Sequence, residues 1–74
     1  MPRLHTANPG EVIRVLERLG FSKVRQTGSH GFFRHPDGRT TVVPIHQGRD
    51  LGRGLFRKIL DDAGITAEEF ERIR

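Results

Sequence analysis

Two runs of β-branched and aromatic residues, separated by a turn sequence, constrain the fold of this chain more than any other feature. The runs are residues 32–35 and 40–43, and Pro36-Asp37-Gly38 lies between them. Proline suits the first turn position and Asp-Gly permits a tight reversal, so the sequence predicts an antiparallel hairpin. Pro44 ends the second strand, because proline has no N–H to donate to the strand ladder.

The segment before this hairpin predicts a third strand. Residues 21–26 carry no helix signal, and strand alternation would place Lys23 and Arg25 on one side and Val24 on the other. The sequence Gly28-Ser29-His30-Gly31 then marks a turn. We therefore expect a three-stranded antiparallel meander.

A helical pattern precedes the strands. Asn8 is a candidate N-cap, Pro9 suits the first helical position, Glu11 completes a capping box, and Gly20 is a candidate C-terminal cap. Between the two ends, apolar residues recur at helical spacing: Val12, Val15, Leu16 and Leu19. The sequence predicts an amphipathic helix of about three turns.

Two more helices are expected after the strands. An apolar stripe runs from Leu51 to Ala63, with Asp50 as its candidate N-cap and Gly64 as its stop. A second capping box, Thr66-Ala67-Glu68-Glu69, opens a short third helix. The order α-β-β-β-α-α indicates an α+β fold with helices on one face of a three-stranded antiparallel sheet.

Length and cysteine content limit the classes of protein that this chain can represent. With 74 residues, it is expected to form a single domain over residues 1–74, with a modest core. Because it has no cysteine, neither a disulfide nor a thiolate metal site can brace it. No apolar run approaches the ~20 residues of a membrane span, and no signal peptide is evident, so we expect a cytoplasmic protein.

The charge is basic and unevenly distributed. Thirteen lysine and arginine residues oppose nine acidic residues, and most of the excess lies between residues 18 and 60, whereas residues 61–74 are acidic. A basic segment rich in arginine is typical of a surface that binds phosphate groups. The same charge also fits ordinary solubility, so it leaves both interpretations open.

Four histidines are candidates for chemistry near neutral pH. His5 is interpreted as a solvated residue, His35 as a surface imidazole at the hairpin tip, and His46 as a hydrogen-bonded loop residue. A metal site is not expected, because it would need three or four converging ligands and no closely spaced pair on a helix supplies them.

His30 has different surroundings. Glycines lie close to it on both sides, so the backbone can approach a ligand, and Lys23, Arg25 and Arg34 lie on the neighbouring strands. An imidazole beside phosphate-binding groups can take the proton from an RNA 2′-hydroxyl, which then attacks the adjacent phosphorus. Taken alone, Gly-Ser-His-Gly is a weak motif and equally describes a turn that contains a histidine.

Several runs together resemble the HicA toxin family, bacterial mRNA interferases of type II toxin–antitoxin systems. The resemblance spans nearly the whole chain and rests on Gly20-Phe21, residues 25–30, residues 33–39, Val43-Pro44, His46, Gly48, Asp50-Leu51, Gly54-Leu55, Ile59-Leu60 and Ala63-Gly64. It implies a fold like the double-stranded-RNA-binding domain, RNA cleavage for which the histidine of the Gly-Ser-His run is essential, and a HicB-type antitoxin that masks this histidine. The imidazole chemistry described above requires no metal or other cofactor.

The family motif assigns the catalytic role to His30, with Gly28 and Ser29 shaping its turn. Two departures affect this assignment: Gly31 and Phe32 follow His30 where relatives often have a polar residue and an aliphatic one, and Arg49, Gly52 and Arg53 precede or open the second helix where lysines are commoner. The candidate RNA-binding residues are Lys23, Arg25, Gly28, Ser29, Arg34, Arg49 and Arg53.

Two other classes of function remain open. A small RNA-binding module without catalysis would use the same fold, which binds duplex RNA by shape. A DNA-binding protein would fit the basic segment, but no recognition-helix pattern supports it. Phe32 and Phe33 alternate in a strand, so one of them can face RNA or a partner, or both can lie in the core.

Overall fold

The computed structural model describes residues 6–45 and 49–74. Its elements are α1 (Pro9–Leu19), β1 (Ser22–Thr27), β2 (His30–Arg34), β3 (Thr40–Pro44), α2 (Arg53–Ala63) and α3 (Ala67–Ile73). This order confirms the predicted α+β fold and matches the layout of the double-stranded-RNA-binding domain. Among the described residues, no helix is both long and apolar enough to cross a membrane.

The helix ends follow local sequence everywhere except at the start of α2, and Gly64 ends α2 in the left-handed conformation as expected. Asn8 and Thr66 each form the predicted capping box, and Gly20 ends α1 in the left-handed conformation with φ 108°. The expected Asp50 cap is wrong, because α2 starts at Arg53 with Gly52 as its N-cap. Leu51 is buried and its N–H donates to the carbonyl of Ala7, which holds the chain outside the helix at this point.

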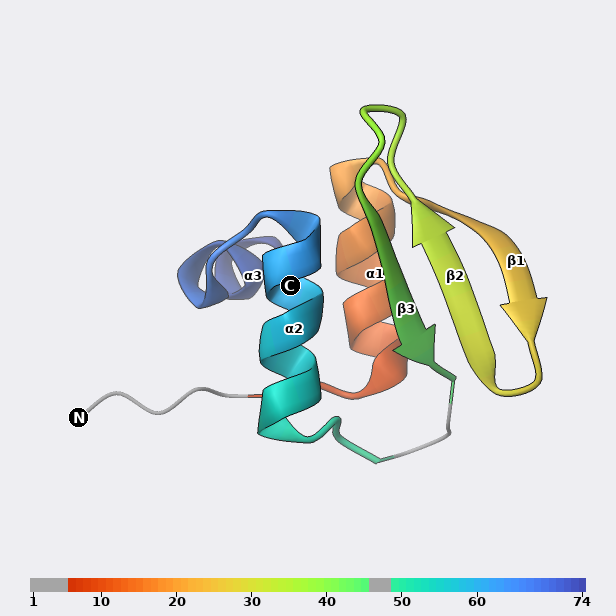
Figure 1. Cartoon of the computed structure of the whole chain (residues 1–74). Coiled ribbons are helices and arrows are strands. Elements are labelled where there is room, and N and C mark those ends of the chain that lie inside the picture. The colour runs from red at the N-terminus through yellow and green to blue at the C-terminus, as the bar shows by residue number, and fades with distance from the viewer. Residues whose placement is uncertain (1–5, 46–48) are drawn as a thin grey trace.

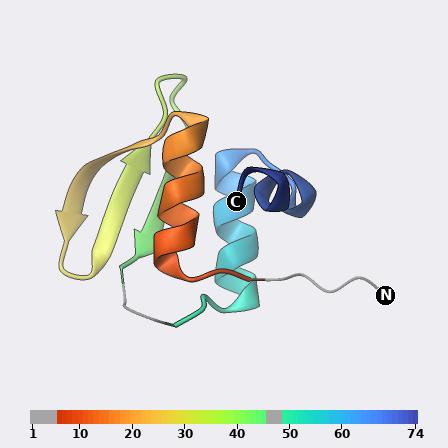
Figure 2. The same cartoon turned by 180° about the vertical axis from the view of Figure 1, so that it is seen from behind.

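The sheet has the order β1-β2-β3 with both pairs antiparallel, as the meander prediction requires. Figure 1 shows β1 at the edge farthest from the helices, and Figure 2, from behind, shows α1 lying in front of β3. The helices therefore cover the β3 side of one face. We call the opposite face, which no described helix covers, the open face.

The hydrophobic core lies between the helices and strands β2 and β3. Phe33 and Val43 point into it, together with helix residues that include Leu16, Phe56 and Ile59. Strand β1 contributes nothing to this core, because all six of its residues are exposed. The edge strand is therefore held by its ladder with β2, and its side chains remain available to solvent or ligands.

A β-bulge in β1 overturns the expected sidedness of its basic residues. Lys23 pairs with Phe33 and Arg25 pairs with Phe32, so Val24 is an extra residue between two pairs. Phe33 and Phe32 point to opposite faces, and Lys23 and Arg25 follow them. Lys23 and Arg25 therefore lie on opposite faces of the sheet, contrary to the regular alternation expected from the sequence.

Candidate functional site

His30 is the first residue of β2 and lies on the open face. It pairs with Thr27 on one side and Pro44 on the other. Gly31 and Phe33 are buried on the helix side, so alternation directs His30, Phe32 and Arg34 away from the helices. His30 itself is exposed, and its imidazole is accessible to a ligand.

The turn before His30 is a two-residue hairpin connection formed by Gly28 and Ser29. Gly28 has φ +58°, a conformation that glycine adopts without strain, and its Cα faces open space. The carbonyl of Ser29 accepts a hydrogen bond from the N–H of Ile45, which ties the turn to the end of β3. The two residues thus fix the position at which β2, and with it His30, begins.

Gly31 stands where the fold leaves no room for a side chain. A Cβ at this position would lie 2.8 Å from Cδ1 of Ile45 and 3.0 Å from Cε1 of Phe33. The absence of a side chain lets Ile45 lie against the inner face of the sheet beneath the His30 turn. The glycine is therefore used for packing, on the face opposite to the imidazole.

Arg25 and Phe32 form a second feature of the open face. They are paired across β1 and β2, and the guanidinium carbon of Arg25 lies over the Phe32 ring, 4.5 Å from its centroid. This distance is within the range of a cation–π interaction. Of the two phenylalanines whose placement the sequence left open, Phe33 lies in the core and Phe32 lies half-buried on the open face.

Arg34 lies farther along β2, opposite Ser22 and Thr40. Beside it is a shallow hollow of about 240 Å³, lined by Ser22, Val24, Arg34, His35 and Pro36. The bulge residue Val24 is 62% exposed and forms part of the lining of this hollow. A basic side chain thus lies at the edge of a shallow hollow with both polar and apolar lining.

The charge of the open face is positive. Among the described residues, the paired strand positions on this face carry two arginines, one histidine and no acidic side chain. These positions are Ser22, Arg25, Thr27, His30, Phe32, Arg34, Thr40, Val42 and Pro44. No described carboxylate on this face therefore opposes the approach of a phosphate.

The other basic candidate residues lie outside the strand pairs of the open face. Lys23 lies on the other face, where its Nζ donates to Oε1 of Gln26 at 2.7 Å. Arg49 and Arg53 are exposed at the segment that leads into α2, at the same end of the molecule as the β1–β2 turn but on the side of the helices (Figure 1). His5 and His46, together with Gly48, lie outside the described residues.

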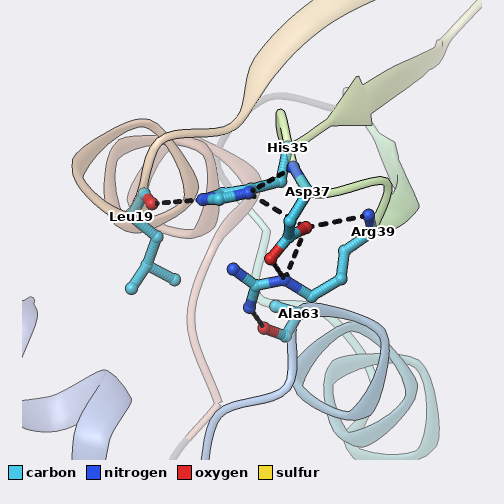
Figure 3. Close-up of polar contacts among 5 residues, drawn as sticks. All are labelled: Leu19, His35, Asp37, Arg39 and Ala63. Carbon is cyan, nitrogen blue, oxygen red and sulfur yellow. Dashed lines mark hydrogen bonds and ion pairs between the residues drawn. The ribbon is translucent and has the colours of Figure 1, made fainter.

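His35 is a structural residue, which corrects its interpretation as a surface imidazole. Its side chain is 20% exposed, and its ring meets the Phe21 ring edge-on at a centroid distance of 5.2 Å. Figure 3 shows Nε2 directed at the carbonyl of Leu19, 3.1 Å away, and the backbone N–H of Asp37 donates to Nδ1. Because a carbonyl oxygen only accepts, Nε2 donates to Leu19, while Nδ1 also lies 3.0 Å from Oδ1 of Asp37.

The same hairpin is also fastened to α2. Nε of Arg39 donates to both carboxylate oxygens of Asp37, and its Nη1 donates to the carbonyl of Ala63 (Figure 3). The hydrogen bonds from the side chain and then the backbone of Arg39 hold the pKa of Asp37 below its ordinary value. Sequence reasoning missed this cluster, since only the fold brings the tip of the hairpin to the ends of α1 and α2.

Metal ligands do not gather in the described part of the chain. In residues 6–45 and 49–74, no group of three or more His, Cys, Asp and Glu side chains is placed to hold a metal ion.

The fold and the open face define a small α+β protein of the double-stranded-RNA-binding-domain type with an exposed histidine on a basic sheet surface. A family described as the HicA toxin of bacterial toxin–antitoxin systems matches residues 10–65, from α1 to just beyond α2. The chain therefore belongs to the HicA toxin family, as the sequence resemblance indicated. Membership implies an antitoxin partner. A comparison with curated proteins found no match.

Proposed function

We propose that this protein is an RNA endonuclease that cleaves mRNA, with His30 as its catalytic base. The observation that carries the proposal is the exposed imidazole on a sheet face that holds Arg25 and Arg34 and, in its described part, no acidic residue. Its mRNA substrate places the activity in the cytoplasm, where cleavage blocks translation and growth.

The proposed chemistry begins at the RNA 2′-hydroxyl. His30 takes the proton from this hydroxyl, and the oxygen attacks the adjacent phosphorus. The bond from phosphorus to the 5′-oxygen breaks, and that oxygen receives a proton either from the protonated His30 or from a second acidic group of the protein. The products are a 2′,3′-cyclic phosphate and a 5′-hydroxyl. Arg25 and Arg34 stabilise the negative charge that develops on the phosphoryl oxygens. Each step uses groups of the protein, so the scheme needs no metal ion.

A HicB-type antitoxin is the proposed partner. Because the family works in toxin–antitoxin pairs and His30 lies on an exposed face, an antitoxin that covers this face would block access of RNA to the imidazole. Cleavage should then stop when purified antitoxin is added in excess.

Replacement of His30 tests the catalytic assignment. We expect His30→Ala and His30→Gln to reduce the RNA cleavage rate by about 100-fold or more, the lower range for loss of a general base. Cleavage would be followed on labelled RNA, and growth arrest would be followed in cells. Thr40→Ala, exposed on the same face, is the control and should cleave at the wild-type rate. A wild-type rate in His30→Ala would contradict the assignment.

Two further outcomes separate the proposal from its alternatives. If wild-type protein binds RNA and never cleaves it, the protein is a non-catalytic RNA-binding module. If excess EDTA abolishes cleavage and Mg²⁺ restores it, the metal-free scheme is wrong. Cleavage that persists in EDTA and ends in a 2′,3′-cyclic phosphate would support it.

A further inference from the structure

We propose that Arg25 and Phe32 form a platform on which one base of a single-stranded RNA stacks, next to the nucleotide whose 2′-hydroxyl loses its proton to His30. This inference rests on the proposed function, because it assigns the contact that positions the substrate. It assigns single-stranded RNA to the open face and gives the half-buried Phe32 a role.

The first argument is the geometry of the pair. The Arg25 guanidinium lies over the ring of Phe32, with its central carbon 4.5 Å from the ring centroid. An RNA base can stack on an aromatic ring or on a guanidinium plane. Here the Phe32 ring lies against the Arg25 guanidinium and holds it in place. The contact with Phe32 restrains the Arg25 guanidinium, so a base would meet a side chain already near its binding position.

The second argument is the position of the platform relative to His30. Phe32 is two residues beyond His30 in β2 and on the same face, which separates the two side chains by roughly 7 Å. The bulge at Val24 is what directs Arg25 to this face, since a regular strand would leave Arg25 on the face of Lys23. A nucleotide stacked on the platform would hold its neighbour at the imidazole.

The third argument concerns the kind of ligand. A duplex buries its bases in its own stack, whereas a single strand can present an unpaired base to the platform. The cationic side chains of the described face favour a polyanion over a basic or neutral peptide. An acidic surface of the antitoxin would satisfy the charge, but it would not need a stacking pair beside the catalytic base. We therefore commit to single-stranded RNA as the occupant.

Fluorescence of a short single-stranded RNA that contains 2-aminopurine tests the platform. Stacking quenches this base, so binding of the RNA to the cleavage-deficient His30→Ala protein should quench its fluorescence. In the same background, we expect Phe32→Leu and Arg25→Gln each to weaken binding roughly tenfold and to reduce the quenching at saturation. Arg14→Gln removes an exposed charge from α1 and should leave both quantities unchanged. Thermal unfolding checks that each variant is folded.

Three results would overturn the proposal. Unchanged binding and quenching in Phe32→Leu would overturn it, as would tighter binding of a duplex than of the single strand. Loss of antitoxin binding in Phe32→Leu with unchanged RNA binding would identify the face as a protein interface and would also overturn it.

The proposed function can fail independently of the platform. If wild-type protein does not cleave RNA but Phe32→Leu still loses quenching, the cleavage assignment fails and the platform stands. If cleavage depends on His30 while Phe32→Leu retains wild-type KM and kcat, only the platform is wrong.

Discussion

His30 and His35 lie at opposite ends of β2 and have opposite surroundings. His30 is exposed at the turn, whereas His35 contacts Phe21 and the carbonyl of Leu19. The sequence singled out His30 but could not show that His35 is packed, because both histidines stand beside turn residues. The difference depends on where the end of α1 lies relative to the hairpin, which is a property of the tertiary fold.

His35→Ala should destabilise the protein. The change removes the donor to Leu19 and the edge-on contact with Phe21, so we expect the free energy of unfolding to fall by about 1–3 kcal/mol. Urea unfolding followed by circular dichroism would measure it. His30→Ala is the matched control and should change stability by no more than about 0.5 kcal/mol. Equal effects of the two changes would contradict the structural role of His35.

At the scale of the elements, the sequence predicted the helix starts and turns that depend on interactions between residues close together in the chain. The capping boxes at Asn8 and Thr66 and the Pro36-Asp37-Gly38 turn act within a few residues, and all three appear where expected. The bulge at Val24 could not be predicted, because it depends on how β1 aligns with β2. It changes the site directly, since it separates Lys23 from Arg25.

The Glu11 carboxylate at the start of α1 should make the free energy of unfolding fall at acidic pH. The hydrogen bond from the Asn8 backbone N–H and the contact with Arg74 hold the pKa of Glu11 below its ordinary value of 4.5. A lowered folded-state pKa stabilises the fold at pH above that ordinary value, and this stabilisation is lost as pH falls through the folded-state pKa. Glu11→Gln should therefore lower stability near neutral pH and make its acid-side fall shallower.

Urea unfolding at a series of pH values would measure this effect. Glu17→Gln, an exposed change on the same helix, is the control and should keep the wild-type pH profile. A Glu11→Gln protein with the wild-type profile would show that this carboxylate does not contribute to acid sensitivity.

At the scale of the whole molecule, the structure shows on which faces the basic residues behind the net charge of +4 lie. Two arginines share the open face with His30, whereas Arg53 lies on the helix side and Lys23 on the reverse of the sheet. The sequence established the basic excess, but not which charges lie together, because that depends on strand register and on the bulge.

Salt dependence would show which of these charges meets phosphate. In the His30→Ala background, Arg34→Gln should make the slope of log affinity against log salt less negative by about 0.7, the value for one lost contact with a single strand. Arg53→Gln should leave the slope unchanged. If instead Arg53→Gln changes the slope and Arg34→Gln does not, the RNA contacts belong to the start of α2.

The bulge at Val24 also affects how the protein behaves towards copies of itself. β1 is an edge strand with exposed residues throughout, and such an edge is a template on which another chain can add a strand and begin aggregation. An extra residue interrupts the regular row of hydrogen-bonding groups, and the flanking Lys23 and Arg25 repel a second copy. The irregularity that brings Arg25 to the open face thus also helps an uncovered strand to remain soluble.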